Sequence, residues 1–180
     1  MRALTLIFMV LAFIVGGFLS VFQFKCIENR MGTDGDPQKL DQVYTLVENA
    51  QKEIDELKKQ GVDVTKIDDS QIQQSLDTIA KTPPRWKVEY AGKLGILLAV
   101  LAFAMVVVAF MKKEMVNKLA VAVIVLALVV WFSAPDIAAG KYSGANPKTI
   151  ALIAFAALAV SSACAMMSYK LYLKKSKITA

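Results

Sequence analysis

The chain has 180 residues, 56% of them hydrophobic, and a mean hydropathy of +0.49. These values exceed those of an ordinary soluble domain and predict an integral membrane protein. The formal net charge is +6 and the sequence contains no histidine, the commonest ligand of haem and catalytic zinc and the usual general base near neutral pH. We therefore expect no cofactor and no bound metal.

The charge is unevenly distributed along the chain. Residues 26–92 hold nine Lys or Arg against thirteen Asp or Glu, and the rest of the chain holds twelve against two. Basic residues near the ends of apolar segments report membrane orientation rather than nucleic-acid binding. We expect the partners to be the lipid bilayer and other membrane subunits or a second copy of the chain, with no nucleic acid.

The first predicted element is a membrane helix within residues 1–25, because its apolar run is long enough to cross a hydrocarbon core of about 30 Å. No small-x-small cleavage site follows the run, so we predict an uncleaved signal anchor. Ala12, Gly16 and Ser20 recur every four residues, a spacing that lets another helix approach closely.

Residues 26–90 form a polar stretch, which we call the insert. Asp36 followed by Pro37 predicts an N-cap and a first helical residue, and Gly61 is a suitable stop for the helix that follows. Apolar side chains recur along this helix at alternating steps of three and four, the pattern of an amphipathic helix. We call them the seam: Leu40, Val43, Val47, Ala50, Ile54 and Leu57.

The seam needs a cover, because burying a few apolar side chains contributes less free energy than ordering the helix costs. One alternative is a second helix that starts after a capping box at Thr65 and Asp68, runs to about Lys81 before Pro83, and folds back as an antiparallel hairpin. Its apolar side chains would be Ile67, Ile72, Leu76 and Ile79.

The other alternative is an intermolecular coiled coil, in which the seam pairs with another chain. The hairpin and the coiled coil can occur in the same molecule, because Tyr44 and Leu46 widen the apolar stripe beyond what one short helix would hide.

Further membrane helices are predicted at residues 91–111, 119–134 and 148–169, joined by a short basic loop at 112–118 and an outer loop at 135–147, with a basic tail at 170–180. Ala91, Gly95 and Ala99 repeat the small-residue spacing of the first helix. Trp86 and Tyr90 stand where aromatic side chains meet the bilayer surface.

The fold expected is therefore an all-α integral membrane protein with four transmembrane helices and an extracytoplasmic helical hairpin between the first and second. Basic residues in the N-terminus, the 112–118 loop and the tail place both termini in the cytoplasm. We expect the bacterial cytoplasmic (inner) membrane. Cys26 and Cys164 would then lie at opposite depths and could not form a disulfide with each other.

The sequence contains few residues that indicate transport, catalysis or metal binding. The predicted membrane helices contain Thr5, Ser20, Ser161, Ser162 and Cys164 but no charged group in their cores, whereas a transporter needs such groups to handle its cargo. No clustered carboxylate pair or activated nucleophile indicates an enzyme. The sequence Asp34-Gly35-Asp36 lacks the further ligands of a calcium loop.

We therefore predict a non-enzymatic accessory or scaffold subunit of a membrane complex. It would bind partners, or itself, through the seam and the small-residue faces. The alternatives are a small channel or transporter assembled from several copies, and a sensor whose outer hairpin perceives a ligand.

Overall fold

The computed structural model describes residues 1–33, 35–64, 69–137 and 144–179. The regular structure is helical, with no strand among the described residues. Four helices in the described part of the chain are long and apolar enough to cross a membrane, which indicates a membrane protein.

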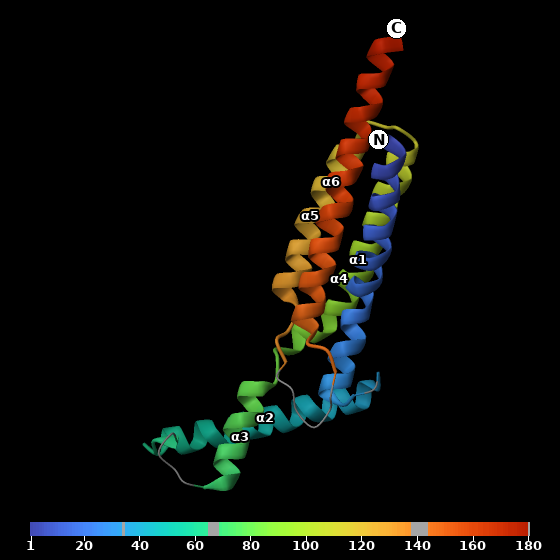
Figure 1. Cartoon of the computed structure of the whole chain (residues 1–180). Coiled ribbons are helices and arrows are strands. Elements are labelled where there is room, and N and C mark those ends of the chain that lie inside the picture. Colours follow the sequence, from blue (N-terminus) through green and yellow to red (C-terminus); the bar gives the residue numbers. More distant parts are fainter. Residues whose placement is uncertain (34, 65–68, 138–143, 180) are drawn as a thin grey trace.

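The long apolar helices pack side by side as a bundle, and they are α1 (Arg2–Met31), α4 (Arg85–Phe110), α5 (Met115–Ser133) and α6 (Pro147–Thr179) (Figure 1). α1 packs against α4 and α6, and α5 packs against the same two helices. Each helix is therefore antiparallel to both of its neighbours, and both chain termini lie at one end of the bundle (Figure 1).

α2 (Pro37–Lys59) and α3 (Ser70–Lys81) lie at the opposite end of the bundle. The two helices pack together through a cluster in which Ile54, Val64 and Ile72 are buried. α2 and α3 run in different directions in Figure 1, and the antiparallel hairpin stays a prediction. α2 has 23 residues and α3 has 12, or about 34 and 18 Å, so α3 is too short to retrace α2.

Local signals set the ends of several helices. α1 ends at Gly32, which adopts a left-handed conformation with φ 67°. Asp36 caps α2 by accepting from the N–H of Gln38, and Pro37 is the first helical residue. α2 stops before Gly61, which has φ 79°.

The starts of α3 and α6 follow the same logic. Asp69 caps α3 by accepting from the N–H of Gln71, and Asn146 caps α6 by accepting from the N–H of Lys148. The predicted cap at Thr65 and Asp68, as well as Ile67 and Asp34, lie outside the described residues.

Two bundle helices extend beyond the predicted membrane segments. α1 continues past residue 25 to Met31, and α6 continues past residue 169 to Thr179. Neither extension contains Gly or Pro, so nothing interrupts the backbone hydrogen bonds. α4 begins at Arg85, before the predicted residue 91. Both ends of the insert, which the sequence placed at residues 26 and 90, therefore lie within bundle helices.

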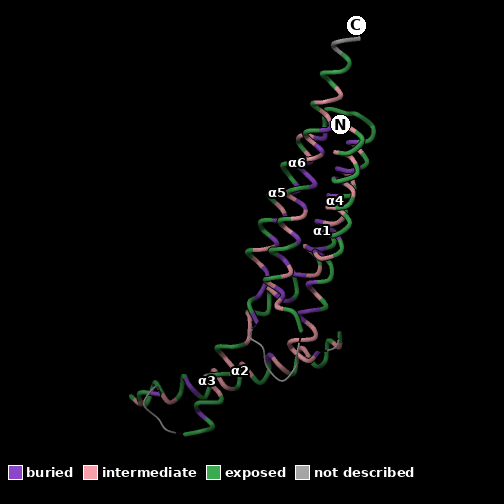
Figure 2. Tube along the Cα trace, in the orientation of Figure 1, coloured by how far each residue is buried: buried purple, intermediate pink, exposed green. Residues whose placement is uncertain are grey.

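The main core runs along the interior of the bundle, where buried positions recur on each long helix (Figure 2). A second cluster closes the end of the bundle nearest α2; it contains buried Ile27, Val88, Ala91 and Ile137. Arg30 on the last turn of α1 donates to the carbonyls of Ile137 and Gly144. These bonds tie α1 to the segment that connects α5 with α6.

Candidate functional site

The two ends of the seam are covered by the chain itself. Leu40 is half-buried against the second cluster, which lies between α1 and α4. At the other end, Ile54 is 1% exposed, and Leu57 packs beside it against α3. The predicted hairpin partners Ile72, Leu76 and Ile79 all take part in that contact.

The middle of the seam is covered less well. Val43, Val47 and Ala50 are half-buried, and they belong to none of the apolar clusters found among the described residues. Leu46, one residue before Val47, is 65% exposed. We call Val43, Leu46, Val47 and Ala50 the central strip of α2.

Tyr44 has a different role from the one its place beside the seam suggested. Its side chain is buried, and its hydroxyl donates to the carbonyl of Pro83 at 2.9 Å. The guanidinium of Arg85 lies 5.6 Å from the centre of the Tyr44 ring and donates to Asp41 of α2 at 2.7 Å. Tyr44 therefore does not widen the exposed stripe, as the sequence had suggested, but fastens α2 to the start of α4.

The ionisation of Tyr44 reflects this burial. Loss of solvent around the phenol raises the pKa of Tyr44 to about 12, with Arg85 opposing the shift and Glu89 adding to it. Tyr44 therefore stays neutral, as a hydrogen-bond donor, up to strongly alkaline pH.

The small-residue faces pack within the chain. A Cβ on Gly16 would lie 2.7 Å from the Cγ of Leu158 on α6, and a Cβ on Gly95 would lie 2.1 Å from the carbonyl oxygen of Ser20. Ala91 is buried in the second cluster. Ala12 and Ala99 are half-buried. Gly16, Ser20 and Gly95 are thus occupied by helices of the same molecule.

The buried hydroxyl groups also bond within the chain. Ser20 donates to the carbonyl of Gly17, Ser161 donates to the carbonyl of Met9, and Ser162 contacts the sulfur of Met105. These contacts are the helix-to-helix and within-helix roles expected of serines in membrane helices.

The sequence analysis did not identify one buried polar residue of the bundle. Gln23 on α1 is fully buried; its Nε2 donates to the carbonyl of Ser20, whereas its Oε1 has no partner among the described atoms. A lone amide three residues after Ser20 in an otherwise apolar run was the available signal. Cys26 and Cys164 are both free thiols.

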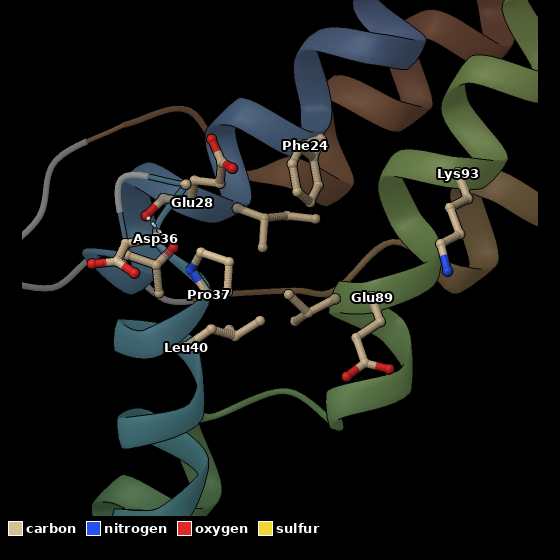
Figure 3. Close-up of a pocket in the computed structure, with 11 residues that line it drawn as sticks. Phe24, Glu28, Asp36, Pro37, Leu40, Glu89 and Lys93 are labelled. Atoms are coloured by element: carbon tan, nitrogen blue, oxygen red, sulfur yellow. Dashed lines mark hydrogen bonds between the residues drawn. The ribbon is translucent and has the colours of Figure 1, made fainter.

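A cavity of about 260 Å³ lies where α1 ends and α2 and α4 begin, and we call it the junction cavity (Figure 3). Its apolar wall consists of Phe24, Ile27, Pro37, Leu40 and Val88. Ile27 and Val88 are buried members of the second cluster. The wall is therefore part of the packed contact between the insert and the bundle.

Charged side chains border the same cavity. They are Glu28, Asp36, Glu89 and Lys93 (Figure 3). Each carboxylate already accepts one hydrogen bond inside the chain; the donors are Lys25 for Glu28, the N–H of Gln38 for Asp36, and Arg85 for Glu89. A carboxylate can accept several hydrogen bonds, so each retains capacity for a ligand.

The chain was compared with protein-family models, with curated proteins and with solved structures, and none of these matches it. The geometry of the insert and the bundle is therefore the basis for inferring a function.

Proposed function

We propose that this chain is a non-enzymatic accessory subunit of a membrane complex, and that a partner chain binds along the central strip of α2. The observation that carries the proposal is the position of Val43, Val47 and Ala50, which are apolar, half-buried and outside every apolar cluster of the described residues. With Leu46 exposed beside them, water contacts an apolar surface that a partner could cover with a gain in free energy.

The pattern of the strip suggests a helical partner. Side chains spaced by three and four residues on one helix fit between those of a second helix, as in a coiled coil or a helix-in-groove contact. The partner is either a different protein or a second copy of this chain, which would offer the same strip. In either case the bundle would hold α2 at the membrane surface.

The small-residue faces have no part in this proposal, although the sequence had suggested them as binding surfaces. Gly16 and Gly95 lie against other helices of the same chain, so a partner would have to displace those helices. The proposal places the partner on α2 alone.

A photo-cross-linking amino acid at position 46 tests the proposal in intact membranes. Because Leu46 is at the exposed edge of the strip, we expect a discrete adduct heavier than the single chain. The same amino acid at Lys52, an exposed α2 position outside the strip, should give little adduct. Two differently tagged copies expressed together tell a homo-oligomer from a complex with another protein.

Substitution then tests whether the strip supplies the binding energy. Leu46→Asp with Val47→Asp should remove the adduct and lower the size of the complex in mild detergent, because two carboxylates would enter an apolar contact. Gln38→Asp with Asn49→Asp adds the same charge at exposed α2 positions and should leave both unchanged. An unaltered complex in the first variant would contradict the proposal.

The channel and the sensor remain alternatives from other classes. In the described part of the bundle the buried polar side chains are uncharged, and the serines bond inside the chain. These observations favour neither alternative over an accessory subunit.

A further inference from the structure

The junction cavity lies at the end of the apolar run of α4, where a membrane helix meets the lipid head groups. Lys93 borders it and stands directly before the apolar run of α4 that begins at Leu94. On the preceding turns of α4, Trp86 and Tyr90 are 52% and 51% exposed, as expected of aromatic side chains at a bilayer surface. The molecules present at highest concentration at this depth are phospholipids.

The size of the cavity suits a small polar head group. Its volume of about 260 Å³ is many times the roughly 10–15 Å³ that one water molecule needs by the same measure. A phosphoethanolamine group, with about eight non-hydrogen atoms, is small enough to enter it. The apolar side chains of Phe24 and Ile27 would contact the carbon atoms of such a ligand.

The charges of the cavity are mixed, which narrows the ligand class. A ligand carrying only a phosphate would face the carboxylates of Glu28, Asp36 and Glu89, and a ligand carrying only an amine would leave Lys93 without a counter-charge. A zwitterion with one ammonium and one phosphate satisfies both kinds of group.

The order of the charges along α4 matches one orientation of such a zwitterion. Lys93 lies four residues, or about 6 Å, nearer to the apolar segment than Glu89 (Figure 3). In an aminophospholipid the phosphate is attached to the glycerol and the ammonium lies farther out toward water. The phosphate would therefore reach Lys93, and the ammonium would reach Glu89.

We propose that the junction cavity binds the head group of an aminophospholipid, with Lys93 on the phosphate and with Glu89 accepting hydrogen bonds from the primary ammonium. A trimethylated ammonium has no N–H to donate, so the site discriminates against choline lipids. The site is separate from the central strip of α2, and it does not depend on the proposed partner.

Native mass spectrometry of the full chain in mild detergent tests this site. The protein is supplied with equal amounts of dioleoyl phosphatidylethanolamine, phosphatidylcholine and phosphatidylglycerol. We expect one bound lipid per chain, with the ethanolamine lipid preferred about tenfold, because each charge-assisted hydrogen bond contributes an effect of that order. Lys93→Gln and Glu89→Gln should each abolish most of the preference.

Lys87→Gln is the matched control, since Lys87 lies on α4 but does not border the cavity. The preference is the ratio of ethanolamine lipid to choline lipid bound in one sample, so a lower yield of folded protein leaves it unchanged. The unsubstituted chain by itself already tests whether the site prefers the ethanolamine lipid. Equal binding of ethanolamine and choline lipids, or a preference for the glycerol lipid, would overturn the proposal. So would an equal loss in Lys87→Gln, or displacement of the lipid by equimolar soluble glycerophosphoethanolamine, which would make the ligand a free solute.

Discussion

At Gly95 the absence of a side chain sets the distance between α1 and α4. The backbone carbonyl of Ser20 occupies the place that a Cβ would take, and the hydroxyl of Ser20 lies 3.3 Å from the carbonyl oxygen of Gly95. Because the obstacle is backbone rather than a flexible side chain, it cannot move aside without moving α1. This contact holds the two helices close directly above the junction cavity.

Gly95→Ala is therefore expected to destabilise the protein, although alanine favours helix over glycine by about 1 kcal/mol. The added methyl group forces α1 and α4 apart, and such overpacking costs about 1–3 kcal/mol. Thermal unfolding in detergent, followed by circular dichroism, measures the change. Gly17→Ala is the control, because its Cβ would meet only the ring of Phe13 on the same helix, at 3.3 Å. Equal midpoints for the two variants would mean that the close approach is unimportant.

At the scale of elements, α2 is held at its two ends and less firmly between them. The start of α2 is fixed by Leu40 in the second cluster and by the contacts of Tyr44 and Asp41 with the start of α4. Its far end is fixed by Ile54 against Ile72 of α3. Few other α2 positions are buried (Figure 2). The central strip therefore lies on a helix that is fixed at both ends.

The effect of a substitution on the stability of α2 should therefore depend on its position along the helix. Ile54→Asp places a carboxylate in a fully buried site and is expected to destabilise the α2–α3 contact by roughly 3 kcal/mol or more. Leu46→Asp should have little effect in the isolated chain, since Leu46 is exposed. Hydrogen exchange of α2 and α3 in detergent measures both. Equal protection of α2 in the two variants would show that α3 does not support it.

For the whole molecule, the arrangement of the bundle brings separate basic segments to one end. The guanidinium of Arg2 and the ammonium of Lys112 both lie over the ring of Tyr172, at 5.1 and 5.3 Å from its centre. α2 and α3 lie at the other end (Figure 1). Since basic segments favour the cytoplasmic side, we infer that the termini are cytoplasmic and that the insert is outside.

Cysteine labelling tests this orientation in intact cells. In a chain with Cys26 and Cys164 replaced by serine, a membrane-impermeant maleimide should modify Gln73→Cys in α3 and leave Ser176→Cys at the end of α6 unmodified until the cells are opened. Both positions are exposed, so accessibility within the protein does not limit the reaction. The reverse pattern would invert the orientation, and modification of both in intact cells would contradict the three membrane crossings expected between the two positions.

The amino-acid sequence by itself determined those helix ends that carry a local cap or stop signal. Asp36 with Pro37, Gly61, Pro83 and Asn146 act on backbone groups within a few residues, so their effect can be predicted without knowledge of the rest of the fold. The apolar membrane segments are equally local, because length and hydropathy suffice to identify them.

Only the tertiary structure decided which side chains on those helices are covered. Residues of the seam follow one periodic pattern, yet Ile54 is buried by α3 while Val47 belongs to no apolar cluster in the described part of the chain. Tyr44 is buried because Pro83 and Arg85, far along the chain, lie beside it. Burial depends on which distant segments meet, and periodicity states only which side chains share a face.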